Sequence, residues 1–130
     1  MPSASKIKAV VVDDQLTMRS LVRSCLQQIG VLDVREYAGP LEALENLKLQ
    51  PAHVVLSDFN MPGMDGLEFL RTVRADPVLK STGFVLLTGR ADAELVKRAV
   101  QFGANNYLAK PFTVATLRQK LEQVFGALTP

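Results

Sequence analysis

The chain has 130 residues, 48% of them hydrophobic and 22% charged, and a formal net charge of +2 at pH 7. This composition is typical of one globular domain with a sizeable core and excludes global disorder. The small net charge gives no reason to expect nucleic-acid binding, and no apolar stretch approaches the roughly 20 residues of a membrane span. Residues 1–8 lack the apolar core of a secretory signal, and Cys25 has no second cysteine to pair with. We therefore expect a cytoplasmic protein without membrane or nucleic-acid partners.

The first half of the chain contains three strand patterns and two helical patterns. Apolar runs predict strands at residues 9–12 and 54–57, and a shorter strand is expected at residues 34–37. After the first strand, apolar residues recur at helical spacing and predict an amphipathic helix that ends at Gly30. These six residues are Met18, Leu21, Val22, Cys25, Leu26 and Ile29. Pro40 suits the first turn of a second helix, which is expected to turn Leu41, Leu44 and Leu47 inward.

The second half continues the alternation after a loop of turn-forming residues at 60–66. A helical stripe begins with Leu67, Leu70 and Val73, and an apolar run then predicts a fourth strand that ends at Thr88. Asp92 is the expected N-cap of the next helix and Gly103 its expected C-cap. That helix should bury Leu95, Val96, Ala99 and Val100. A fifth strand ends at Lys110, and Thr113 should cap a last helix whose apolar residues are Leu117, Leu121, Val124 and Phe125.

The alternation of five strands with five helices predicts an α/β fold. We expect a doubly wound, five-stranded parallel sheet of the flavodoxin-like kind, with strand order 2-1-3-4-5. The sequence shows no repeat, low-complexity tract or linker, so we expect a single domain over residues 1–130 with no output domain attached. Such a domain would signal through its own surface.

Polar residues follow four of the predicted strands at the point where each strand ends. Asp13 and Asp14 follow the first strand, Asp58 the third, Thr88 the fourth and Lys110 the fifth. Because the carboxyl ends of parallel strands lie on one edge of a sheet, these side chains should converge on one pocket. Clustered carboxylates are costly to ionise together unless a cation joins them. We therefore predict a divalent-metal site beside a place for a phosphoryl group.

Asp58 is the expected nucleophile of this pocket, because a carboxylate can attack phosphorus and form an acyl phosphate. Asp13 and Asp14 could hold Mg²⁺, which binds few carboxylates together with waters and phosphate oxygens. Lys110 supplies a positive charge for the phosphoryl oxygens, and Thr88 supplies a hydroxyl that can bond one of them.

Three motifs surround the predicted pocket. They read VVDD at residues 11–14, SDFNMPGMDG at 57–66 and LAKPF at 108–112. Shorter matches are Thr17-Met18-Arg19 after the acid pair and Ala115-Thr116-Leu117 in the last helix. Together these motifs resemble response-regulator receiver domains, and more narrowly the CheY-like chemotaxis receivers, over nearly the whole chain.

The resemblance implies a phosphorylation-activated signalling switch of a two-component chemotaxis system. Such a protein is not an enzyme, apart from catalysing its own phosphotransfer and dephosphorylation. Asp58 would accept the phosphoryl group from a phosphohistidine of a CheA-like histidine kinase. Mg²⁺ would be bound by Asp14, Asp58 and the backbone carbonyl of Asn60, with Asp13 acting through water.

The resemblance also implies a switch and a control of phosphoryl lifetime. The Thr88 hydroxyl would move onto the phosphoryl group, and Tyr107 would turn inward behind it. Asn60 and Arg90 would flank the water that hydrolyses the acyl phosphate. Arg90 stands where relatives commonly have an acidic or neutral residue, so we expect it to change that lifetime. The peptide bond before Pro111 is cis in most relatives, although sequence alone favours trans.

Two other phosphate-handling classes fit this sequence less well. A haloacid-dehalogenase-type phosphohydrolase would need a second acid at the position of Gln15, and a flavodoxin would need a phosphate loop where the acid pair stands. Among receivers two functions stay open: a diffusible signal that binds the flagellar motor switch, and a phosphate sink that drains the kinase. We expect a monomer, with a phosphatase as a further candidate partner. Its expected output face combines the helix over residues 92–102, the strand with Tyr107 and the helix over residues 113–125.

Overall fold

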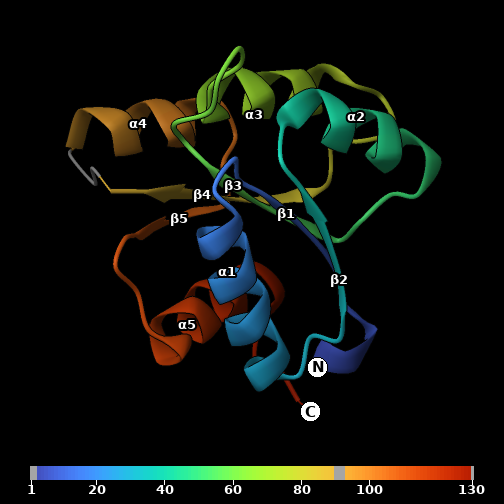
Figure 1. Ribbon diagram of the computed structural model, residues 1–130, viewed down its shortest axis with the longest axis vertical. Helices are drawn as coiled ribbons and strands as arrows, with labels where there is room; N and C mark the ends of the chain where they lie inside the picture. Colours follow the sequence, from blue (N-terminus) through green and yellow to red (C-terminus); the bar gives the residue numbers. More distant parts are fainter. Residues whose placement is uncertain (1–2, 90–92, 130) are drawn as a thin grey trace.

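The computed structural model describes residues 3–89 and 93–129, in which a central parallel sheet is covered by helices on both faces (Figure 1). The five strands are β1 (Lys8–Val12), β2 (Asp33–Tyr37), β3 (Val54–Asp58), β4 (Gly83–Thr88) and β5 (Asn106–Ala109). Their order is β2-β1-β3-β4-β5, and all neighbouring pairs are parallel. The predicted fold is therefore confirmed.

The predicted N-cap Asp92, and Arg90 with its predicted effect on phosphoryl lifetime, lie outside the described residues.

The helices form two layers. On one face of the sheet lie α1 (Leu16–Ile29) and α5 (Val114–Phe125), and on the other lie α2 (Pro40–Leu49), α3 (Gly66–Ala75) and α4 (Ala93–Gln101) (Figure 1). A short 3-10 helix, Ala4–Lys6, precedes β1. The chain passes from β1 outward to β2 and then returns past β1 to β3, so the winding reverses between the carboxyl ends of β1 and β3. No helix within the described ranges combines the length and apolarity that a membrane span needs.

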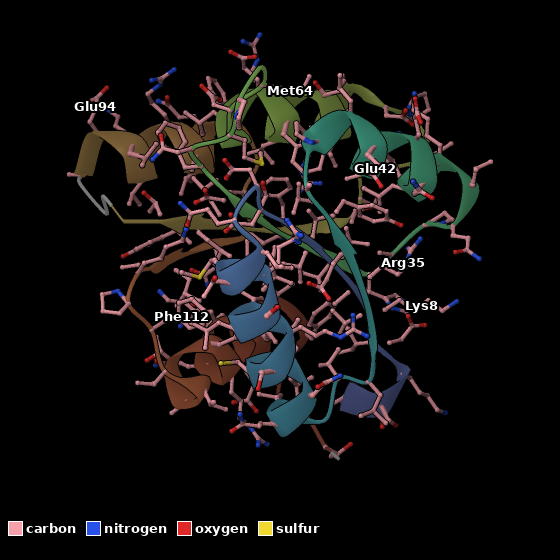
Figure 2. The ribbon with its side chains drawn as sticks, in the orientation of Figure 1. Lys8, Arg35, Glu42, Met64, Glu94 and Phe112 are labelled. Atoms are coloured by element: carbon pink, nitrogen blue, oxygen red, sulfur yellow. The ribbon has the colours of Figure 1, made fainter. Side chains whose placement is uncertain are left out.

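Alternate residues of the central strands fill two separate cores. Ala9 and Val11 of β1 belong to the core beneath α1 and α5, whereas Val10 and Val12 belong to the core beneath α2, α3 and α4. Both faces of β1 are therefore buried, which explains its uninterrupted run of apolar residues. In Figure 2 the labelled Phe112 lies on the α1–α5 side and Met64 lies on the opposite side.

Local signals in the sequence set most helix ends. Thr113 caps α5 by accepting the backbone N–H of Thr116, and Pro40 is the first residue of α2, as predicted. Gly30 ends α1 with φ 110°, a left-handed conformation that strains other residues. Asp65, which the sequence placed only in a loop, caps α3 by accepting the backbone N–H of Glu68 at 2.9 Å. The α3 helix therefore begins one residue earlier than expected.

Three apolar residues expected inside lie on the surface instead. Leu21 is 46% exposed, Leu41 66% and Val100 62%. Each lies about a quarter of a turn or more from the centre of the buried face of its helix, where a helix that packs on a sheet makes no contact. On α2, Ala43 lies inside where the sequence had suggested Leu41.

Candidate functional site

Three carboxylates meet at the point where the winding of the sheet reverses. Asp13 follows β1 directly and Asp58 is the last residue of β3, and the two strands are neighbours. Asp13 is fully buried, Asp58 is 6% exposed and Asp14 is exposed. One carboxylate oxygen from each residue lies within 4.8 Å of the others. The structure thus brings together the three acids that the sequence predicted to converge.

Lys110 brings a positive charge into this acidic cluster from the end of β5. Its Nζ donates to Oδ1 of Asp58 at 2.7 Å and lies 3.7 Å from Oδ2 of Asp13. Its backbone N–H donates to the Thr88 carbonyl at 2.8 Å, which fixes the ends of β4 and β5 to each other. The peptide bond between Lys110 and Pro111 is cis, as the resemblance implied. The ammonium is therefore placed between the two buried carboxylates.

Asp13 is held by two hydrogen bonds, whereas one of its carboxylate oxygens makes none within the described residues. Its Oδ1 accepts the Gln15 N–H at 2.9 Å, and its own N–H donates to the Tyr37 carbonyl at 3.1 Å. Its Oδ2 is buried and has no hydrogen-bond partner within the described part of the chain. Burial raises the pKa of the Asp13 carboxyl; the Gln15 bond and Lys110 act against the rise, and Asp58 and Asp14 add to it.

This arrangement fits a small divalent cation. The donor atoms are carboxylate oxygens, the hard ligands that Mg²⁺ prefers. The buried Oδ2 of Asp13 lacks a hydrogen-bond partner among the described residues and has only the Lys110 ammonium at 3.7 Å to offset its charge. Three carboxylates face a single ammonium among the described residues, so a further cation would relieve their repulsion. The residues present therefore suit the magnesium site that the sequence predicted.

The loop after β3 folds tightly over the Asp58 backbone because position 66 has no side chain. A Cβ on Gly66 would lie 2.7 Å from the Asp58 carbonyl oxygen and 2.9 Å from Cα of Phe59. The Gly66 N–H donates to the Phe59 carbonyl at 2.8 Å, which closes the loop. Asn60, within this loop, is exposed, and its predicted carbonyl ligand and lifetime roles remain predictions. The close approach at Gly66 helps to fix Asp58 at the edge of the sheet.

The two residues predicted to act as a switch lie on neighbouring strands. Thr88 is the last residue of β4 and is 1% exposed, whereas Tyr107 of β5 is half-buried against the core beneath α4. Nζ of Lys120 lies 4.3 Å from the centroid of the Tyr107 ring. The Lys120 side chain is itself partly buried, so its ammonium is positioned to make a cation–π contact with this ring.

Arg19 is a residue whose contact with the site the sequence did not reveal. It stood in the motif that follows the acid pair, but no role followed from its position. In the structure its Nη1 donates to the backbone carbonyl of Asp13 at 2.7 Å. No local pattern signals a bond from a helix back to a strand end.

The sequence is similar to a known domain family and to known proteins. The chain matches the model of the response regulator receiver domain over residues 9–122. It is 46% identical over 128 residues to the "Probable chemotaxis protein CheY" of Rhizobium etli, covering 98% of this chain and 99% of that protein. It is 40% identical to chemotaxis protein CheY-3 of Vibrio cholerae, covering 94% of each.

A solved structure shows the same fold at a comparable similarity. The chemotaxis response regulator CheY4 of Vibrio cholerae matches with a TM-score of 0.83 and 35% identity, over 91% of this chain and 98% of that one. The family model covers most of the chain, and the matched residues include the acidic cluster at the sheet edge. The chain therefore belongs to the response regulator receiver family.

Proposed function

We infer that this receiver is a phosphorylation-activated switch of a two-component chemotaxis system, acting in the cytoplasm. The observation that carries the proposal is the contact of the Lys110 ammonium with Asp58 at 2.7 Å, inside a cluster of three carboxylates. The chemotaxis assignment is supported by the relatives in Rhizobium etli and Vibrio cholerae, which are named as chemotaxis proteins. The receiver acts as a signalling component and not as a metabolic enzyme.

Asp58 is the proposed phosphoacceptor, with a phosphohistidine on a CheA-like kinase as donor. A carboxylate oxygen of Asp58 attacks phosphorus, so that an O–P bond forms as the P–N bond of the donor breaks, and the histidine ring keeps the electron pair. Lys110 already lies against one Asp58 oxygen and can bond the transferred group. The Thr88 hydroxyl can donate to another phosphoryl oxygen. Hydrolysis of the acyl phosphate restores the free carboxylate.

Mg²⁺ is the cofactor that this cluster would hold, through Asp14, Asp58 and the Asn60 carbonyl, with Asp13 acting through water. When bound, it supplies charge neutralisation for the phosphoryl oxygens. The residues around it do the positioning. Asp13 stays fixed by its bonds to Gln15 and Tyr37, so its carboxylate need not rearrange when the cation binds.

Phosphorylation is proposed to change the surface formed by α4, β5 and α5. The backbone bond between Lys110 and Thr88 joins the two groups that would follow the phosphoryl oxygens. Tyr107 lies on β5, the strand of that surface that pairs with β4. The α4 helix also carries Val100, an apolar side chain that is 62% exposed. A flagellar motor switch protein is the proposed partner.

Titration of a motor-switch peptide against the phosphorylated and unphosphorylated protein tests this function. We expect the two affinities to differ by roughly 5–150-fold, the usual range of such coupling. Tyr107→Ala should reduce that ratio while Asp58 is still labelled. Lys97→Ala removes an exposed charge from α4 and should leave the ratio unchanged. Equal affinities of both forms would reject this output face and favour the phosphate sink that drains the kinase.

A further inference from the structure

One arginine of α1 contacts the backbone of the acidic cluster. Nη1 of Arg19 donates to the Asp13 carbonyl at 2.7 Å, and only 16% of the Arg19 side chain is exposed. A charged donor bound to a carbonyl makes a strong hydrogen bond, and partial burial protects that bond from water. Arg19 therefore fixes the orientation of the peptide unit that follows Asp13.

Arg19 is itself held by a neighbouring strand. Its Nε lies 3.8 Å from Oε1 of Glu36 on β2, and Oε2 of Glu36 accepts Nη1 of Arg23 at 2.6 Å. Glu36 has 22% of its side chain exposed, so both pairs are partly shielded from solvent. We call these three residues the Arg19–Glu36–Arg23 cluster. It connects α1 and β2 to the end of β1.

The bonds around Asp13 leave one atom to face the cation site. The N–H donates to the Tyr37 carbonyl, the carbonyl accepts from Arg19, and Oδ1 accepts from Gln15. Oδ2 is buried and has no hydrogen-bond partner within the described residues, and the Lys110 ammonium lies 3.7 Å from it. With backbone and first oxygen fixed, the direction of Oδ2 is determined. Removal of the Arg19 bond frees the peptide unit between Asp13 and Asp14, which carries both acids.

We propose that Arg19 is a positioning residue for the divalent-cation site, because it sets the orientation of the Asp13–Asp14 peptide unit. This inference rests on the proposed Mg²⁺-dependent function of the same site. Partners of metal ligands commonly change metal affinity by roughly 10–100-fold when they are removed. We expect Arg19→Ala to weaken Mg²⁺ binding by about tenfold, the lower end of that range, since Gln15 and Tyr37 still hold Asp13.

The direction in which Arg19→Ala changes the Mg²⁺ affinity distinguishes a positioning role of Arg19 from an effect of its charge alone. Arg19 is a cation near a site that binds a cation, so its charge alone opposes Mg²⁺. If charge were its whole influence, Arg19→Ala would strengthen Mg²⁺ binding. A positioning role predicts the opposite. Arg19→Lys keeps the charge, but its single ammonium cannot bond the Asp13 carbonyl and Glu36 at the same time as a guanidinium does. The Mg²⁺ affinity of Arg19→Lys should therefore lie between those of wild type and Arg19→Ala.

Titration calorimetry of Mg²⁺ into the unphosphorylated protein is the test, with no phosphodonor present. Arg23→Ala is the matched control. It removes the same charge from the same helix, and like Arg19 its guanidinium pairs with Glu36. The bond to the Asp13 carbonyl comes from Arg19. We expect Arg23→Ala to bind Mg²⁺ within about twofold of wild type. Circular dichroism and urea unfolding in EDTA establish that each variant is folded. If Arg19→Ala does not fold, Arg19→Lys against wild type carries the same comparison.

The Mg²⁺ affinities distinguish a failure of the Arg19 inference from a failure of the proposed function. Weaker Mg²⁺ binding by Arg19→Ala, with Arg23→Ala near wild type, supports the inference. Equal or tighter binding by Arg19→Ala, or equal weakening by Arg23→Ala, overturns it while wild-type Mg²⁺ binding and Asp58 labelling stand. Wild-type protein that binds no Mg²⁺ would overturn the proposed function and this inference with it.

Discussion

Replacing Asp13 by asparagine should stabilise the metal-free protein and weaken its response to Mg²⁺. The carboxylate is fully buried, and its Oδ2 has no hydrogen-bond partner among the described residues. Asparagine has nearly the same shape, and its side-chain oxygen can keep the bond from the Gln15 N–H. The substitution therefore removes a buried charge with little change in packing.

The distances from Asp13 to its charged neighbours show whether charge interactions or desolvation decide the change in stability. With an effective dielectric constant near 20, attraction to Lys110 at 3.7 Å amounts to about 4.5 kcal/mol. An Asp58 oxygen lies within 4.8 Å of an Asp13 oxygen, so repulsion between the two carboxylates amounts to at least about 3.5 kcal/mol. The repulsion offsets most or all of the attraction, so the cost of removing the carboxylate from water decides the sign of the change in stability. After the remaining bond from Gln15 is taken into account, we expect the free energy of unfolding to rise by about 1–2 kcal/mol in EDTA.

The pH dependence follows from the raised pKa of Asp13. Because the folded state holds the proton more tightly than the unfolded state, protonation of Asp13 favours folding. Its contribution is fully present below the ordinary pKa of 3.8 and is lost as the pH rises through the raised folded value. The advantage of Asp13→Asn should therefore be largest above that folded value and should disappear below pH 3.8.

Urea unfolding of wild type and Asp13→Asn in EDTA and in Mg²⁺, at several pH values, measures the difference in their free energies of unfolding directly. A ligand that binds only the folded state stabilises it, so Mg²⁺ should stabilise wild type more than the variant and reduce or reverse the difference. Asp14→Asn is the control, since Asp14 is exposed and its replacement should change stability by no more than about 0.5 kcal/mol. A variant that is less stable than wild type in EDTA at neutral pH would refute the reasoning.

Three further substitutions test the site and its support. Gly66→Ala should destabilise the fold by about 1–3 kcal/mol in urea unfolding, because its Cβ would meet backbone atoms at 2.7 and 2.9 Å, whereas Gly39→Ala meets nothing within 4 Å and should cost clearly less. Lys110→Ala removes a cation that competes for Asp58 Oδ1, so calorimetry should show tighter Mg²⁺ binding; weaker binding would contradict this role. Thr113→Ala removes the cap of α5 and should cost about 1 kcal/mol, and an unchanged unfolding midpoint would exclude the cap as a source of stability.

The fold could be predicted because its signals are local. The apolar run of β1, Pro40 at the start of α2 and Thr113 before α5 each act within a few residues, and the strand order follows from the alternation of elements. The convergence of Asp13 and Asp58 was predictable for the same reason, since strand ends in a parallel sheet share an edge. The structure confirms that they meet, and their chemical roles remain predictions.

Contacts between distant segments could not be predicted from local pattern. Arg74 of α3 donates to the carbonyls of Thr82 and Gly103, eight and 29 residues away in sequence, and burial lowers the pKa of its guanidinium. The stacking of Lys120 on Tyr107 and the bond from Arg19 to Asp13 also depend on which helix face meets which strand. Periodicity indicates that a helix has an apolar face but does not give its width, which is why Leu41 was wrongly placed inside.

The central claim is that Asp58 accepts a phosphoryl group with the help of a divalent cation. The direct test is the intact mass of the protein after incubation with acetyl phosphate, with Mg²⁺ or with EDTA, for wild type and Asp58→Asn. We predict that wild type gains the mass of one phosphoryl group in Mg²⁺ and far less in EDTA, and that Asp58→Asn gains none. Full labelling of Asp58→Asn, or equal labelling of wild type in EDTA, would contradict the assignment.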